Sequence, residues 1–194
     1  GTWNTTNGTF SHTTTGVNRI LFVGVLVESG ADIVGTVTYS GGTMTKLGPQ
    51  SNSIPNEFIY LFFLTNPAPG ANDIIVQASA GSSTGAVSAS YTGVNPLGQP
   101  DASGSVTTNS TTLGTVNLTT VADNSWMTSF VGWDSGGTPL ASSGVIARGS
   151  TIDRALGDSG TAITPPALTS QIWSNANSGR FLGIGASFSP STGG

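Results

Sequence analysis

Two short segments of the chain consist almost entirely of apolar residues. They are residues 20–27 and residues 58–64, and both are rich in β-branched or aromatic side chains. Runs of this length and composition are typical of the central strands of a β-sandwich. We therefore place both segments in the hydrophobic core.

Other segments alternate between apolar and polar residues, as strands with one face in water do. Residues 74–76, 87–91 and 181–188 follow this pattern, and Ile33 with residues 36–39 forms a further example. Glycine, proline, serine and asparagine cluster between the predicted strands and favour turns. No window of eleven residues has the periodicity of a helix. The sequence predicts an all-β protein, an antiparallel, jelly-roll-like β-sandwich of roughly twelve to fourteen strands.

The chain also contains an internal similarity. Residues 8–18 align without gaps on residues 114–124, and a strand containing Phe-Val-Gly follows each segment. The strong bias to threonine and glycine also produces such matches by chance. We expect one domain over residues 1–194, and the alternative is two related halves, 1–98 and 99–194, packed into one sandwich.

Several segments share the strand starts, glycine turns and strand ends of one kind of sandwich. They are residues 11–25, 37–47, 59–61, 66–67 and 90–94. Together they resemble a widespread, largely uncharacterised β-sandwich module of bacterial, archaeal and phage surface or secreted proteins. The resemblance covers most of residues 8–95 and, weakly, residues 185–188. It implies the sandwich fold and an extracellular location, at a cell surface or in a virion, and it implies no catalytic residue.

Charged residues make up only 7% of the 194 residues, against about 25% in ordinary soluble domains. The net charge is -4, and the five lysines and arginines are scattered singly. We therefore exclude nucleic acid as a partner, because phosphate binding needs clustered basic side chains. No segment has the roughly 18 apolar residues of a membrane-spanning helix, so we expect no membrane insertion. The chain has no cysteine, which excludes disulfides and thiolate metal sites.

Candidate catalytic residues are few. Residues 157–160, Gly-Asp-Ser-Gly, are similar to the nucleophile loop of trypsin-like serine proteases, but Thr161 follows where those enzymes have glycine. Such a protease also needs a histidine base held by an aspartate, and His12, the only histidine, lacks the expected flanking residues. The nine acidic residues show no spacing that identifies a glycosidase pair. We predict that the protein is not an enzyme and that His12 makes a structural hydrogen bond.

We predict no cofactor and no metal, with one alternative. Asp123, Asn124, Asp134 and Asp153 could supply oxygen ligands for a calcium ion, as in many extracellular sandwiches. The chain has no Asp-x-Asp-x-Asp loop, which is the more specific signature of such a site.

Lys46, the only lysine, has two interpretations. Some surface-appendage domains join a lysine to an asparagine or aspartate through an isopeptide bond that a buried acid promotes. Glu57, which precedes an apolar strand, would be that acid. The simpler interpretation is an edge lysine that discourages pairing with other strands.

The shortage of charge leads to the main functional hypothesis. A β-rich surface with few ionisable groups can be buried between copies without desolvating many charges. We therefore predict a non-enzymatic extracellular structural module, a subunit of a surface filament, layer or virion shell, whose main partners are copies of itself. Residues 1–15 form the expected exchanged strand or arm, which pairs with a neighbour's sheet. The residues expected to take part are Gly1, Thr2, Trp3, Thr5, Thr6, Thr9 and Phe10.

The alternative hypothesis is a carbohydrate-binding module or adhesin domain whose partner is a glycan. Exposed aromatic faces suit sugar rings, and Trp126, Trp133 and Trp173 are the candidates. An odd number of positions separates Trp126 from Trp133, so a regular strand directs them to opposite faces. The N-glycosylation pattern occurs at Asn4, Asn7, Asn109 and Asn117, where a modified chain would expose loops or edges.

Overall fold

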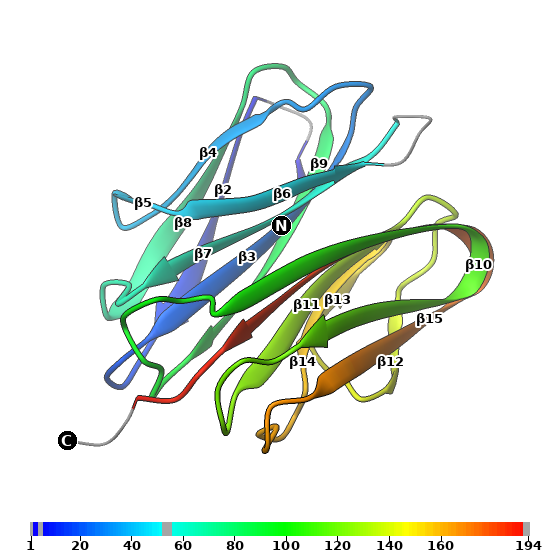
Figure 1. Ribbon diagram of the computed structural model, residues 1–194. Coiled ribbons are helices and arrows are strands. Elements are labelled where there is room, and N and C mark those ends of the chain that lie inside the picture. Colours follow the sequence, from blue (N-terminus) through cyan, green and yellow to red (C-terminus); the bar gives the residue numbers. More distant parts are fainter. Residues whose placement is uncertain (1, 4–5, 52–55, 192–194) are drawn as a thin grey trace.

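The computed structural model describes residues 2–3, 6–51 and 56–191, which form strands and no helix. Every strand pair in these ranges is antiparallel, so the predicted all-β, antiparallel fold is confirmed (Figure 1). The described strands are β1 (Thr2–Trp3), β2 (Asn7–Thr14), β3 (Ile20–Glu28), β4 (Val34–Tyr39), β5 (Gly42–Thr43), β6 (Thr45–Ser51), β7 (Phe58–Thr65), β8 (Gly70–Ala78), β9 (Ser83–Tyr91), β10 (Ala102–Thr119), β11 (Trp126–Trp133), β12 (Leu140–Ser143), β13 (Ile146–Thr151), β14 (Arg154–Asp158) and β15 (Leu168–Phe188).

The strands form three sheets. The central sheet has the order β1-β9-β3-β7-β6, and the outer sheet has the order β2-β8-β4-β5. The bent sheet has the order β10-β15-β11-β14-β13, with β12 also paired to β15. Successive strands alternate between the central and outer sheets from β1 to β4 and again from β7 to β9, as in a jelly roll. The predicted jelly-roll-like order is therefore present in the first half of the chain.

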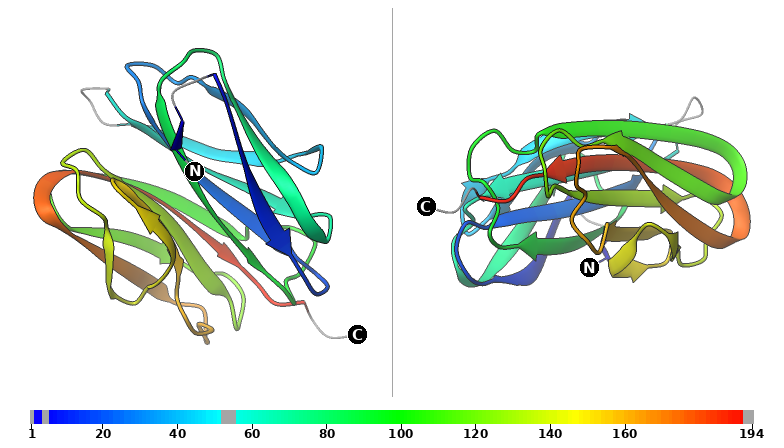
Figure 2. Two further views of the ribbon diagram at one scale, coloured as in Figure 1. Left: turned by 180° about the vertical axis from the view of Figure 1, so that it is seen from behind. Right: turned by 60° about the horizontal axis from the view of Figure 1, so that its bottom comes forward.

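The central sheet lies between the other two sheets (Figures 1 and 2). One of its faces packs on the outer sheet through a core that includes Val23 and Val76. Its other face packs on the bent sheet through a core that includes Phe22 and Phe130. Every residue of β3 except Glu28 is buried as a result. The two continuous apolar runs are strands β3 and β7 of this sheet. Their residues are apolar on both sides because both faces of the sheet are covered, which confirms their predicted place in the core.

The bent sheet folds over on itself. β10 and β15 pair in two stretches, residues 102–108 with 181–187 and residues 113–119 with 168–174, and the register shifts between the stretches. A third core, which includes Trp133, fills the space inside this bend. Residues 181–188 were expected to have one wet face, and that expectation is wrong because all eight are buried. The central sheet covers one face of this strand, and the folded half of its own sheet covers the other.

The two halves of the chain share one strand order. The two stretches of β10 take the places of β1 and β2, and the two stretches of β15 take those of β8 and β9. β11 then corresponds to β3, β12 to β4, β14 to β7 and β13 to β6. This correspondence is the pattern that an internal duplication would leave. The duplication itself and the division into halves 1–98 and 99–194 stay predictions.

Glycine allows the two halves to approach closely. A Cβ atom on Gly24 of β3 would lie 2.1 Å from Cδ2 of Phe130 on β11. On the facing strand, a Cβ on Gly132 would lie 2.7 Å from Cδ1 of Leu26. Real Cβ atoms do not approach other atoms this closely, so each glycine leaves room for a side chain of the opposite half. Both glycines belong to the repeated Phe-Val-Gly sequence.

The predicted assembly arm pairs within its own chain. Thr2 and Trp3 of β1 lie opposite Gly85 and Thr84 of β9. β2, which contains Thr9 and Phe10, pairs along its length with β8, and the Thr6 carbonyl accepts a hydrogen bond from the Ala78 N–H at 2.7 Å. Gly1 and Thr5 lie outside the described residues. Exchange of this segment between copies stays a prediction, and it would require leaving these pairings.

Candidate ligand-binding site

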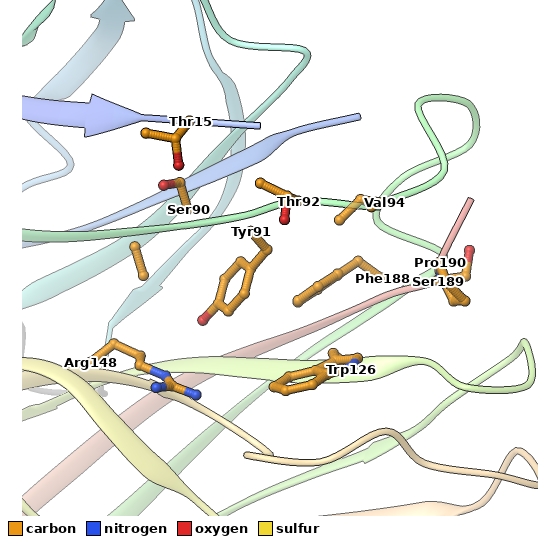
Figure 3. Close-up of a pocket in the computed structure, with 12 residues that line it drawn as sticks. Thr15, Ser90, Tyr91, Thr92, Val94, Trp126, Arg148, Phe188, Ser189 and Pro190 are labelled. Atoms are coloured by element: carbon orange, nitrogen blue, oxygen red, sulfur yellow. The ribbon is translucent and has the colours of Figure 1, made fainter. Parts of the chain in front are cut away.

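A pocket of about 530 Å³ opens where the two halves of the chain meet (Figure 3). Both halves contribute to its lining, one through the end of β9 and the other through the starts and ends of strands in the bent sheet. The lining residues are Thr15, Ala89, Ser90, Tyr91, Thr92, Gly93 and Val94 from the first half, and Trp126, Arg148, Phe188, Ser189 and Pro190 from the second.

Aromatic rings form one wall of the pocket. The Tyr91 ring centroid lies 4.7 Å from that of Phe188 and 6.4 Å from that of Trp126. Trp126 begins β11 opposite Phe188 of β15 and is only half-buried. Behind these rings Phe22 packs on Phe188 with the centroids 5.5 Å apart. The buried ring cluster holds Trp126 in place while part of the residue remains exposed.

A buried carboxylate that does not itself line the pocket holds two of the lining residues, Tyr91 and Arg148. The Asp158 side chain is fully buried, and Arg148 donates to it through Nε at 2.5 Å and Nη2 at 2.9 Å. The Tyr91 hydroxyl donates to the same carboxylate at 2.9 Å, and the Gly160 N–H donates at 2.8 Å. Burial, together with the negative charge of Asp158, raises the pKa of Tyr91, so its hydroxyl stays protonated. The hydrogen bond to Asp158 likewise raises the pKa of Arg148.

Arg148 reaches this position through a β-bulge. Ala147 of β13 pairs with Gly157 and Gly149 pairs with Leu156, so Arg148 is the extra residue between two successive pairs. A bulge of this kind turns a side chain away from its regular direction and is common beside functional sites. The Arg148 side chain keeps two-fifths of its surface exposed, at the edge of the pocket.

Oriented hydroxyl groups complete the lining. His12 on β2 hydrogen-bonds with the Ser90 hydroxyl through Nε2 at 3.0 Å and with the Ser88 hydroxyl through Nδ1 at 2.9 Å. Burial lowers the pKa of His12, which favours the neutral ring. On the other side, the Gln99 amide donates to the Ser189 hydroxyl at 2.7 Å. The structural hydrogen bond expected of His12 is thus present, and it links the outer sheet to the central sheet beside the pocket.

Of the three predicted sugar-binding tryptophans, only Trp126 is partly exposed and lines the pocket. Trp133 and Trp173 are fully buried in the third core. Their ring N–H groups donate to the Thr111 carbonyl and to the Ser129 hydroxyl, each at 3.0 Å. The prediction for these two residues is wrong, because the bent sheet folds over on itself and encloses both in the third core. Trp126 and Trp133 do lie on opposite faces of β11, as their spacing predicted.

Sequence reasoning did not place Tyr91, Arg148 and Phe188 in a site. These residues come from strands that are far apart in the chain and meet only when the two halves pack. A local signal exists at Asp158, since the Gly-Asp-Ser-Gly turn supplies the carboxylate and the Gly160 N–H. The protease-like arrangement is not formed: the Ser159 hydroxyl donates to the Thr161 carbonyl, and His12 lies in the other half.

A second, acidic cavity of about 440 Å³ lies elsewhere between the halves. Glu57 is 94% buried there, and its Oε2 has no hydrogen-bond partner among the described residues. Burial and the nearby charges of Asp134, Asp153 and Glu28 raise its pKa to about 7. The cavity is lined by Glu28, Asn56, Glu57, Asp134, Gly136, Ile152, Asp153 and Arg180.

The proposed calcium ligands are only partly brought together. Asp134 and Asp153 line the acidic cavity, and Asp134 forms an ion pair with Arg180. Asp123 is not part of this cavity and instead accepts a hydrogen bond from the Thr164 hydroxyl at 3.3 Å. Within the described ranges, no three acidic or histidine side chains are arranged to hold a metal ion.

Lys46 lies beside Asp32 rather than beside Glu57. Its ammonium is 3.2 Å from Oδ1 of Asp32, donates to the Val34 carbonyl at 2.8 Å and lies 4.6 Å from the centroid of the Tyr60 ring. The pair is partly exposed, and Glu57 belongs to the acidic cavity. The arrangement expected for an isopeptide bond promoted by Glu57 is therefore not formed.

The predicted glycosylation positions that the structure describes are exposed. Asn7, Asn109 and Asn117 all lie on strand surfaces open to solvent. The Asn117 side-chain oxygen also accepts a hydrogen bond from the Ser170 hydroxyl at 2.6 Å. Asn4 lies outside the described residues. Modification of these positions stays a prediction.

Comparison with known proteins gives no further identification. The chain matches no protein-family model, no curated protein and no solved structure. The resemblance to surface and secreted sandwich modules stays a prediction. In the part of the chain that the structure describes, no helix has both the length and the apolar character needed to cross a membrane.

Proposed function

We propose that this protein is a non-enzymatic extracellular module that binds carbohydrate in the pocket beside Trp126. The observation that carries the proposal is the pairing of a partly exposed Trp126 with the anchored Arg148 in one pocket of about 530 Å³. A sugar ring has an apolar face that stacks on an aromatic ring, and hydroxyls that need directed hydrogen-bond partners. The pocket offers both, since hydroxyl side chains alternate with aromatic ones along its walls.

The rigidity of the pocket also supports binding. Arg148 is held by two hydrogen bonds to Asp158, and Ser90 is held by His12. Side chains that are already ordered lose little conformational entropy when a ligand binds. An aromatic surface between such groups therefore favours a ligand with both apolar and hydroxyl-rich faces.

Binding is tested with purified protein and a panel of neutral and acidic oligosaccharides. We expect a change in tryptophan fluorescence on titration with at least one of them, and loss of at least tenfold in affinity in Trp126→Ala, about 1.4 kcal/mol. Leu168→Ala, which removes an exposed apolar side chain outside the pocket, is the control and should bind like the wild type. Failure of every oligosaccharide to bind, measured by calorimetry as well, would contradict the proposal.

Assembly with copies of itself is the second candidate function, and the outer face of the bent sheet favours it. The alternate residues of β10 and β15 that point outward are all uncharged, while their inward neighbours fill the third core. Leu113, Leu140 and Leu168 are more than half exposed on this face. A second copy could cover it without bringing like charges together. The outward residues are Leu113, Thr115, Asn117, Thr119, Leu168, Ser170, Ile172 and Ser174, with Leu140 beside them.

A further inference from the structure

We infer that the pocket beside Trp126 selects uncharged over acidic carbohydrate, and that the Arg148–Asp158 pair sets this selection. The inference rests on the proposed carbohydrate binding and names the class of ligand. The charges of Arg148 and Asp158 and the hydrogen bonds that fix Arg148 support it.

Arg148 is the only charged residue among the residues that line the pocket. Asp158 balances this positive charge, because its carboxylate lies 2.5 Å from Nε and 2.9 Å from Nη2 of Arg148. The two residues form a bidentate pair in which the side-on edge of the guanidinium is already used. A carboxylate on a ligand would bind next to Asp158 and bring a second negative charge to the same guanidinium. The charge of the pair therefore gives an acidic sugar no net advantage.

Asp158 itself has no capacity left for a ligand. Besides Arg148, the Tyr91 hydroxyl donates to it at 2.9 Å and the Gly160 N–H at 2.8 Å, and its side chain is fully buried. Four donors are enough to occupy a carboxylate. The carboxylate acts as a positioning group that holds the guanidinium, and the ligand meets only the donors of Arg148 that face the pocket.

The remaining polar groups suit hydroxyls. Thr15, Ser90, Thr92 and Ser189 line the pocket, and a hydroxyl both donates and accepts. Sugar hydroxyls also do both, whereas a carboxylate only accepts. The N–H groups of Arg148 at the pocket edge then complete the hydrogen bonds to a neutral ring that stacks on Trp126.

The decisive variant is Asp158→Asn, which removes the balancing charge with almost no change in shape. The less strongly held Arg148 should then bind acidic ligands, so affinity for a uronic acid oligomer should rise about tenfold, whereas affinity for a neutral oligomer should not rise. The gain should disappear in high salt, because salt screens a partly exposed charge. Asp73→Asn, which removes an exposed carboxylate on β8 outside the pocket, is the matched control and should show no gain.

The measurement is calorimetric titration of wild type and variants with neutral oligomers of glucose or mannose and with uronic acid oligomers of equal length, at about 50 and about 500 mM NaCl. Circular dichroism of each variant establishes that it is folded. If Asp158→Asn is unfolded, Arg148→Met with Asp158→Asn removes both charges, and it should lose affinity for the neutral oligomer without gaining affinity for the acidic one.

Three results would count against these proposals, the first two against the selection and the third against carbohydrate binding itself. Equal or tighter binding of the uronic acid oligomer by the wild type overturns the inference but leaves carbohydrate binding intact. A gain for the acidic oligomer that is the same in Asp158→Asn and Asp73→Asn also overturns it, because that gain reflects overall charge alone. Absence of binding to any oligomer, neutral or acidic, contradicts the proposed function instead.

Discussion

Single glycines decide how closely the two halves pack. Gly24 faces Phe130, and a Cβ there would lie 2.1 Å from Cδ2 and 2.3 Å from Cγ of the ring. Gly24→Ala should therefore force the ring or the strand to move and should lower the free energy of unfolding by about 1–3 kcal/mol. Urea denaturation followed by tryptophan fluorescence measures this change.

A matched glycine provides the control for that change. A Cβ on Gly35 of β4 would meet its nearest atom, the Gln77 carbonyl oxygen, at 3.9 Å, an ordinary contact. Gly35→Ala should leave the stability within about 0.5 kcal/mol of the wild type. Equal losses in the two variants would mean that the Phe130 contact is not what Gly24 protects.

Individual side chains are also where sequence reasoning fails most clearly. The spacing of Trp126 and Trp133 predicted opposite faces correctly, because strand geometry is local. Nothing in the sequence indicates that Trp133 and Trp173 are covered, since they lie on stretches that meet only when the sheet bends over on itself. Arg148 was missed for a similar reason: its direction depends on a bulge, and its partner Asp158 lies on the next strand.

At the scale of the elements, the alternation of apolar and polar residues predicts exposure only while a sheet has one free face. It succeeds for the outer sheet, where β8 buries Ile74 and Val76 and exposes Ile75. It fails for residues 181–188, where Phe181, two glycines and Ser187 occupy the second face of β15. That second face is not wet but is packed against Val116 and Met127, and small residues are what allow this close packing.

The outward face of β10 and β15 provides a test of assembly. Leu168→Lys places a charge on a face whose outward residues are uncharged, and in a two-fold contact it would oppose its own copy. If copies associate through this face, the variant should weaken association at least tenfold, about 1.4 kcal/mol. Sedimentation velocity over a range of concentrations measures it.

Leu97→Lys is the control for that experiment. Leu97 is 77% exposed and lies outside β10, β12 and β15. It should leave association unchanged. A wild type that stays monomeric at high concentration, or a Leu168→Lys variant that associates as the wild type does, would count against this face as a contact between copies.

At the scale of the whole molecule, the boundary between the halves is expected to respond to pH through Glu57. Its pKa in the folded protein is raised from 4.5 to about 7, by burial first and by Asp134, Asp153 and Glu28 next, with Arg180 opposing. The folded state therefore holds the proton more tightly than the unfolded state. The stability contributed by this proton is present at low pH and is lost as the pH rises from about 4.5 to about 7.

Glu57→Gln removes this titration while keeping the shape of the side chain. Relative to the wild type, the variant should gain stability across that pH interval, with a total gain of up to about 3 kcal/mol above pH 7. Denaturation midpoints of both proteins from about pH 4.5 to about pH 8 test this, because other titrating groups cancel in the difference. A difference that does not vary with pH would mean that Glu57 has the same pKa in the folded and the unfolded protein.

The sequence was sufficient for the fold class because strand patterns, turn residues and the absence of helical periodicity all agree. The internal similarity also pointed toward two halves, and the shared strand order is consistent with it. The relation between the halves could not be predicted, since it depends on contacts such as Gly24 with Phe130. The pocket lies at that boundary, so its composition could not be predicted either.

A fragment of the chain that ended near residue 98 would expose one face of the central sheet. The fragment would keep every strand of that sheet. It would lose the bent sheet, which now covers apolar side chains that include Phe22, Leu26, Ile59 and Leu61. Such a fragment would have an exposed hydrophobic face and should aggregate when expressed alone. A protein that recombines these halves must therefore contain another sheet that covers this face. A shared strand order is not enough to make the halves interchangeable.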